Sequence, residues 1–276
     1  MQAYNTETGQ IETLDSFVLQ NTSNPRFVVG IPHCGLHLPT NFPRQFNLYG
    51  TIVNDSDLGS RELFDLTEVG GVVASVNLHR NAIDLNRLGL DGPFKRKNKK
   101  TGQEKYPAPD LTDEEKKKLF GDFYVPFYRK IKETLFSLRE IHENAVLISG
   151  HTFNLGKGKV DICIGGGVDK KLCSLDFKYA LAKNLEKTLT NAGLYRNGIG
   201  MNCPFNGKDG ISGQFGNPEK GVHTLLVEFN RELFIDCYEE PTKPYTSRSV
   251  DPRRITVLRR CLEEAMDVSL RDVFGI

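Results

Sequence analysis

The sequence contains no long hydrophobic run. Its longest apolar stretches are short segments such as GVVASVNL (71–78) and VHTLLVEF (222–229), whereas a helix that crosses a bilayer needs about 20 apolar residues. The first 15 residues are polar and lack the basic-then-apolar order of a secretion signal. We therefore expect no membrane partner and, by default, a cytoplasmic location.

The sequence also has few cysteines and almost no net charge. The six cysteines are scattered at positions 34, 163, 173, 203, 237 and 261. No Cys-(any)-(any)-Cys pair occurs, which predicts free thiols and excludes cysteine-rich zinc modules. A formal net charge of +1 provides no overall attraction for nucleic acid. The composition, 38% hydrophobic and 26% charged, is that of a globular protein.

Short apolar runs bounded by turn residues predict five strands. They are residues 27–31, 71–78, 145–149, 160–164 and 222–229. Helical patterns lie between them, and strands that alternate with long helices are typical of an α/β fold. We predict a single α/β domain over residues 1–276, with a mixed, mostly parallel sheet flanked by helices.

The predicted helices have recognisable ends and apolar faces. Residues 112–115 (TDEE) have the form of a capping box, and their helix should bend near Pro126, because proline removes an intrahelical hydrogen bond. Its apolar stripe is Phe127, Ile131, Leu135, Leu138 and Ile141. A second helix carries Phe177, Leu181, Leu185 and Leu189 and ends at Gly193, and a third begins at Asp251-Pro252 and carries Ile255, Leu258, Leu262 and Ala265.

Residues 92–110 (GPFKRKNKKTGQEKYPAPD) interrupt the alternation of strands and helices. They are basic, contain prolines and have few apolar residues. No aromatic residues are interleaved with the basic ones as in a surface that binds single-stranded nucleic acid. We therefore predict an exposed basic loop, which could cover a site as a lid.

Polar residues gather where the predicted strands end. His33 follows the first strand, residues 79–87 (HRNAIDLNR) follow the second, and His151 follows the third. Glu228 interrupts the last apolar run. Ligands of α/β folds bind beyond the carboxyl ends of the strands, so these groups are expected to meet there.

Two histidines and a carboxylate from separate strand ends form the ligand set of a catalytic zinc site. Such a metal activates water and polarises a carbonyl. Asp55 and Asp57 lie close together between the first two strands, so either one can supply the carboxylate. Simpler interpretations remain, because a lone histidine is more often structural and Glu228 can pair with Arg231.

Taken in order, these pieces resemble the N-formylglutamate amidohydrolase family, a branch of the zinc-carboxypeptidase-like hydrolases. The resemblance covers about residues 26–240 and rests on six motifs. They are Pro32-His33-Cys34-Gly35, Asp57 ahead of Leu63-Phe64, Arg80 with Asp84 to Arg87, His151, Asn202 with Phe205, and Gly221-Val222-His223 with Glu228.

The resemblance implies a zinc-carboxypeptidase-like fold and a zinc centre with one ion per chain. His33, Asp57 and His151 would be its ligands, with Asp57 favoured over Asp55 by its spacing from Leu63-Phe64. Glu228 would be the general base.

The remaining motifs imply substrate contacts. Arg80 would polarise the scissile carbonyl, Asn86 and Arg87 would hold a substrate carboxylate, and Asn202 would also bind substrate. The implied activity is zinc-dependent hydrolysis of the N-acyl amide bond of a small carboxylate-bearing substrate such as N-formylglutamate. Two alternatives stay open: a metallopeptidase of the same superfamily and a non-catalytic protein that binds a small ligand.

The chain departs from the family pattern at three places. Residues 149–152 read Ser-Gly-His-Thr where the family has Asp-(any)-His-Ser, so an acid that would orient this histidine is replaced. The family's Tyr-His pair is Phe127-Tyr128 here. Gly213-Gln214 stands near the position of a family arginine, which suggests a different N-acyl amino acid or a small amide as substrate.

Overall fold

A computed structural model describes most of the chain. It covers residues 1–6, 8, 10–15, 17–40, 55–94, 111–154, 160–168, 171–208, 210–235 and 250–276. No helix in these ranges is long and apolar enough to cross a membrane. The predicted basic loop, 92–110, falls mostly outside the described residues, as does Cys237, and the extent of the domain stays a prediction.

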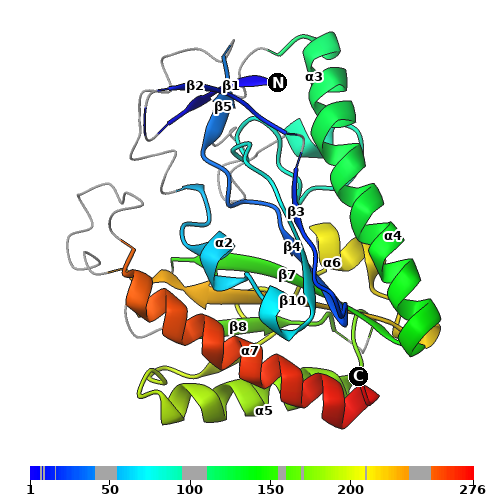
Figure 1. The fold of residues 1–276 in the computed structure, drawn as a ribbon, viewed down its shortest axis with the longest axis vertical. Coiled ribbons are helices and arrows are strands. Elements are labelled where there is room, and N and C mark those ends of the chain that lie inside the picture. Colours follow the sequence, from blue (N-terminus) through cyan, green and yellow to red (C-terminus); the bar gives the residue numbers. More distant parts are fainter. Residues whose placement is uncertain are drawn as a thin grey trace.

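A seven-stranded sheet forms the centre of the fold, in the order β3-β6-β4-β7-β10-β8-β9 (Figure 1). Its strands are β3 (Val18–Gln20), β4 (Phe27–Ile31), β6 (Gly71–Ser75), β7 (Ala145–Phe153), β8 (Ile162–Gly165), β9 (Ile199–Met201) and β10 (Val222–Asn230). The four strands β6, β4, β7 and β10 run parallel. At the edges, β3 pairs antiparallel with β6, and β8 pairs antiparallel with β10 but parallel with β9. This mixed, mostly parallel sheet confirms the predicted fold class.

A second, smaller sheet is antiparallel, in the order β2-β1-β5. Its strands are β1 (Gln2–Asn5), β2 (Ile11–Thr13) and β5 (His37–Pro39). The sequence analysis did not predict it, because strands of three or four residues are too short to show a periodic pattern. β5 follows β4 closely, so this small sheet anchors the segment that carries His33.

Helices cover both faces of the large sheet. The helices are α2 (Ser60–Leu63), α3 (Asp113–Leu119), α4 (Val125–His142), α5 (Leu175–Asn191), α6 (Gly210–Phe215) and α7 (Pro252–Phe274), and the short turns are η2 (Thr67–Val69), η3 (Gly92–Phe94), η4 (Phe120–Tyr124), η5 (Pro218–Lys220) and η6 (Arg231–Leu233). In Figure 1, α5 and α7 lie together against one face, while α4 crosses the other.

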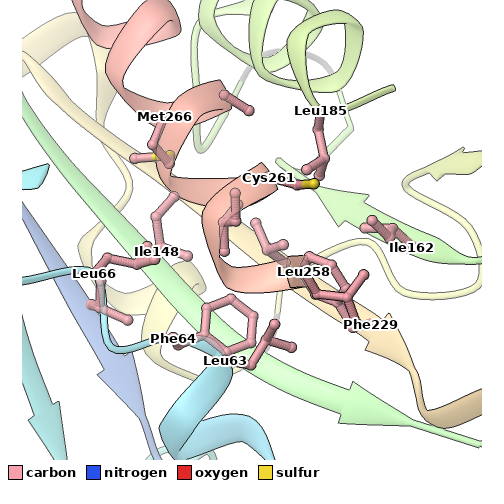
Figure 2. Close-up of a cluster of buried hydrophobic side chains, with 14 of the residues drawn as sticks. Leu63, Phe64, Leu66, Ile148, Ile162, Leu185, Phe229, Leu258, Cys261 and Met266 are labelled. Atoms are coloured by element: carbon pink, nitrogen blue, oxygen red, sulfur yellow. The ribbon is translucent and has the colours of Figure 1, made fainter. Parts of the chain in front are cut away.

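The central strands supply both hydrophobic cores because side chains alternate along a strand. On β4, Phe27, Val29 and Ile31 pack toward α5 and α7, whereas Val28 packs toward α4. Figure 2 shows the first core, where Leu258 of α7 lies over the strands. Strands buried on both faces explain why the sequence showed continuous apolar runs.

The capping box and the apolar stripe of the long helix follow their predictions with one error. Thr112 and Glu115 form the expected capping box, and a π-helical turn, η4, separates α3 from α4 just before Pro126. Phe127 and the three leucine or isoleucine positions after it are buried, but Ile141 is 63% exposed. The prediction for Ile141 is wrong, because the stripe leaves the sheet in the last turn of α4.

The other two helices have the predicted ends. Gly193 has a φ of 69°, the left-handed conformation that favours glycine after a helix. The Asp251 side chain accepts hydrogen bonds from the backbone N–H groups of Arg253 and Arg254 at the start of α7. Both helices bury the predicted apolar residues.

Gly150 of β7 allows α2 to approach the sheet next to His151. A Cβ at this position would lie 2.6 Å from the Phe64 ring, far inside van der Waals contact. Phe64 is fully buried and packs edge-on against Phe229 at 5.8 Å, so it has little room to move. The absence of a side chain at position 150 therefore sets how closely the segment from Asp57 to Phe64 lies against β7.

We expect Gly150→Ala to lower the free energy of unfolding by about 1–3 kcal/mol, the usual cost of overpacking a core. Urea denaturation measures the change. Gly121→Ala is the matched control, because a Cβ at Gly121 meets nothing within 4 Å. In that helical turn alanine should be neutral or stabilising by about 0.4–1 kcal/mol. Equal effects of the two substitutions would contradict the packing argument.

Candidate metal centre

Three buried side chains converge just after β4 and in the C-terminal part of β7. His33 stands two residues after β4, His151 lies within β7, and Asp57 belongs to the segment before α2. Their exposed fractions are 2%, 3% and 4%. The backbone N–H of Asp57 donates to the His33 carbonyl at 2.9 Å. This hydrogen bond links the two segments that carry the candidate ligands.

The geometry of the cluster fits a metal ion. One candidate ligand atom from each of His33, Asp57 and His151 lies within 4.8 Å of the others. His151 Nδ1 is 2.8 Å from Asp57 Oδ2, and His33 Nδ1 is 3.5 Å from the same oxygen. His33 Nδ1 is buried without a hydrogen-bond partner. A buried polar atom without a partner is costly, and a cation held between these three groups would satisfy it.

The two histidines are oriented from behind by different groups. His33 Nε2 donates to Asp84 Oδ1 at 2.7 Å, whereas His151 Nε2 lies 3.0 Å from the Ser149 hydroxyl. Such contacts to the outer nitrogen fix the tautomer and the direction of a ligating ring. A neutral hydroxyl therefore stands behind His151, whereas the carboxylate of Asp84 stands behind His33.

Asp84 is a centre of hydrogen bonds, although it is completely buried. Besides His33, it accepts from the guanidinium of Arg80 at 3.1 Å and from the backbone N–H of Asn86 at 3.0 Å. Arg87 Nε is 3.7 Å away. A buried carboxylate needs such partners to offset its desolvation. The motif at 79–87 therefore folds around Asp84.

Charges around the cluster stabilise the ionised forms. Burial raises the pKa of Asp57, but the contacts with His151 and His33 outweigh burial and hold this pKa well below its usual range. Burial lowers the pKa of Arg80, but the nearby carboxylates, first of all Asp84, raise it above its ordinary value. Both groups are therefore charged at neutral pH.

Arg231, at the end of β10, joins three segments of the site. Its guanidinium donates to the Thr152 hydroxyl at 3.2 Å and to the backbone carbonyl of Ser56, and it lies 3.8 Å from Asp57 Oδ1. It is 4% exposed. The sequence analysis considered Arg231 only as a partner of Glu228, because nothing in the sequence indicated that β7 and the 55–57 segment lie beside it.

Glu228 lies next to the cluster on the neighbouring strand. In the parallel pairing of β10 with β7, it stands opposite His151. Desolvation by burial raises the pKa of its carboxyl to about 7, and the nearby His151 partly opposes this. A carboxyl with a pKa near neutrality can both accept and return a proton.

A cavity of about 570 Å³ opens onto this cluster. The candidate residues that line it are His33, Asp55, Asp57, Arg80, Asn86, Arg87, His151 and Glu228. Asp55 is in the wall but is not part of the three-residue cluster. Phe153 and Phe205 pack edge-on at 5.8 Å and form an apolar part of the lining.

Asn86 and Arg87 differ in how freely they face the cavity. Asn86 Oδ1 accepts from the backbone N–H of Ile211 at 3.1 Å, and its Nδ2 lies 3.4 Å from His151 Nε2. The Arg87 side chain is 40% exposed, with a distant ion pair to Asp84. Arg87 therefore has donors available for a ligand, while the Asn86 side-chain oxygen is engaged by the protein.

Asn202 is not among the residues that line the cavity. Its side chain accepts from the Gly166 N–H and donates to the Gly167 carbonyl, both at 2.9 Å, and its φ is 56°. The predicted substrate contact thus finds no support in the geometry, since both amide atoms hold a neighbouring turn. Phe205, from the same motif, does line the cavity.

The comparison with known families now identifies the chain. The model of the N-formylglutamate amidohydrolase family matches residues 26–235. The chain belongs to this family. A search of curated proteins finds no significant match.

Two solved structures share the fold. The N-formylglutamate amidohydrolase from Ralstonia eutropha JMP134 is 18% identical, with 94% of this chain and 99% of that chain covered and a TM-score of 0.71. A gene product of Agrobacterium tumefaciens is 16% identical, with coverage of 94% and 96% and a TM-score of 0.61. The predicted α/β fold and the resemblance to the N-formylglutamate amidohydrolase family are confirmed.

We expect Asp84→Asn to lower the free energy of unfolding by about 3–5 kcal/mol, because it removes the fully buried carboxylate with which Arg80 forms an ion pair and to which His33 is hydrogen-bonded. Urea denaturation of the metal-free protein measures the loss. Asp122→Asn is the control, since Asp122 pairs with Lys118 at an exposed position and should change stability by less than about 1 kcal/mol. A small, equal effect of both substitutions would refute the central position of Asp84.

Proposed function

We propose that the protein is a zinc-dependent amidohydrolase that cleaves the N-acyl bond of a small carboxylate-bearing amide, such as an N-formyl amino acid. The observation that carries this proposal is the buried group of His33, Asp57 and His151, with His33 Nδ1 left without a hydrogen-bond partner. Membership of the N-formylglutamate amidohydrolase family supports the reaction class.

The three clustered side chains would hold one zinc ion per chain, as nitrogen and oxygen ligands of this number do in catalytic zinc sites. Such an ion supplies a Lewis acid that activates water and polarises a carbonyl. Asp84 and Ser149 contact the outer nitrogens of the two ligand histidines. The protein's own contribution is to keep this set buried and preorganised.

Glu228 would accept the proton of the attacking water and return it to the departing amine. Arg80 would donate to the oxygen of the scissile carbonyl as negative charge develops there. Its side chain is held by Asp84 and is 15% exposed, which restricts its motion. Both residues line the same cavity as the metal cluster, which is the geometry that this division of roles requires.

Arg87 would bind the substrate carboxylate, since a guanidinium offers two parallel donors to a carboxylate. Its side chain is 40% exposed, and Asn86 would assist by fixing the loop through its contact with the Ile211 N–H. The apolar wall of Phe153 and Phe205 would contact the acyl group or the amino-acid side chain. A screen of N-formyl, N-acetyl and N-succinyl amino acids, glutamate derivatives among them, identifies the substrate.

Metal analysis is the first test of the proposal. We expect about one zinc per chain in the wild type after zinc is supplied, and loss of this zinc in the double variant His33→Ala/His151→Ala, because a single remaining ligand cannot retain it. His142→Ala is the control, since His142 lies on α4 and contacts the Pro25 carbonyl, and it should keep the metal. Zinc retained in full by the double variant would overturn the proposed centre.

Glu228→Gln tests catalysis separately from metal binding. We expect the turnover number to fall by about 10²–10⁴-fold, the usual contribution of a general base, while zinc content stays unchanged. Glu219→Gln, at an exposed position before β10, should be fully active. Substrate binding without turnover in the wild type, unaffected by Glu228→Gln, would instead indicate a non-catalytic binding protein.

The protonation state of Glu228 predicts how kcat/KM depends on pH. A protonated Glu228 cannot accept a proton, so kcat/KM should fall as the pH drops. Burial sets the pKa of this carboxyl at about 7, and a cation bound beside it would lower this pKa. We therefore expect the acid limb of the profile below pH 7 in the wild type.

A further inference from the structure

The outer nitrogens of the two candidate ligand histidines contact groups of different charge. Behind His33 stands the buried carboxylate of Asp84, at 2.7 Å from Nε2. Behind His151 stands the hydroxyl of Ser149, at 3.0 Å from Nε2. The outer contacts of the two rings therefore differ in charge, and Ser149 provides the neutral one.

Ser149 is fixed by its place in the sheet. It belongs to the central strand β7, where it is paired with Leu226 of β10 and with Gly30 of β4. Ser149 and His151 are two residues apart, so their side chains leave the strand on the same face. With an exposed fraction of 1%, the hydroxyl has no solvent to bond with.

The neighbouring Asn86 cannot take the place of Ser149. Its Oδ1 accepts from the backbone N–H of Ile211 at 3.1 Å, which fixes the orientation of the amide. The group that faces His151 Nε2, at 3.4 Å, is therefore the NH₂ donor, Nδ2. If Nδ1 ligates a metal, Nε2 carries the ring proton, and of these two neighbours only the Ser149 oxygen can accept it.

We propose that Ser149 is a positioning residue that holds His151 in its metal-facing orientation, and that its neutral hydroxyl makes the metal affinity lower than a carboxylate there would. The inference rests on the proposed metal-dependent function. A carboxylate behind a ligating imidazole increases the basicity of the ring, whereas a hydroxyl orients the ring without adding negative charge. The centre would then have one strongly and one weakly donating histidine.

The test is the dissociation constant for Zn²⁺, measured on metal-free protein by competition with a chelator. Ser149→Ala removes the acceptor and should weaken zinc binding by about 10-fold or more. Ser75→Ala is the matched control, because Ser75 is a serine of β6 that is 1% exposed and whose hydroxyl has no hydrogen-bond partner. It should leave the dissociation constant unchanged. Urea denaturation of both metal-free variants shows that they are folded.

Two more variants separate the hydroxyl from the shape of the side chain. Ser149→Thr keeps the oxygen and should bind zinc within about threefold of the wild type. Ser149→Asp should bind about 10-fold more tightly, because the carboxylate makes the imidazole a better donor. A folded Ser149→Asp variant that binds zinc no more tightly than the wild type would overturn the part of the inference that concerns affinity, whereas the alanine and threonine variants decide the positioning role.

The outcomes distinguish this inference from the proposed function. Absence of zinc binding in the wild type would overturn the proposed function and the inference with it. Zinc binding in the wild type, with equal affinity in Ser149→Ala and Ser75→Ala, would overturn the inference alone. Equal weakening by alanine and threonine would also overturn it, because the hydroxyl would then not be the group that matters.

Discussion

The buried contact between Asp84 and His33 organises the functional half of this protein. A carboxylate with no solvent exposure is tolerated only if donors surround it, and here they come from His33, Arg80 and the backbone of Asn86. The loop that carries the proposed substrate-binding residues must therefore wrap around the same carboxylate that orients a candidate ligand. The candidate metal site and the substrate-binding loop therefore depend on the same residue, Asp84.

The strand β7 imposes the second constraint. Its alternation puts Ser149 and His151 on one face and Gly150 on the other, where the ring of Phe64 occupies the space of a missing side chain. The close approach of α2 keeps the Asp57 segment against the sheet, and Arg231 ties this segment to the ends of β7 and β10. Packing of the core and geometry of the candidate metal centre are thus parts of one arrangement.

The position of the polar cluster is the one expected of a ligand site in this type of fold. Strand ends that converge at one edge of a parallel sheet can bring distant residues within a few ångströms without strain. The proposed centre uses this edge for its histidines and for Glu228, which stands opposite His151 in the strand pairing. Burial raises the pKa of Glu228 to about 7, so that this carboxyl can exchange a proton near neutral pH. The contacts of Asp57 with His151 and His33 keep Asp57 ionised.

Sequence alone determined the five central strands, the three long helices with their caps, and the candidate residues His33, Asp57 and His151, because periodicity and strand-end polarity are local properties of the chain. Only the tertiary structure removed Asn202 from the cavity lining and brought Asp84, Ser149 and Arg231 into contact with the cluster. These depend on contacts between residues far apart in the chain, and neither spacing nor composition encodes which side chains meet when the strands pair.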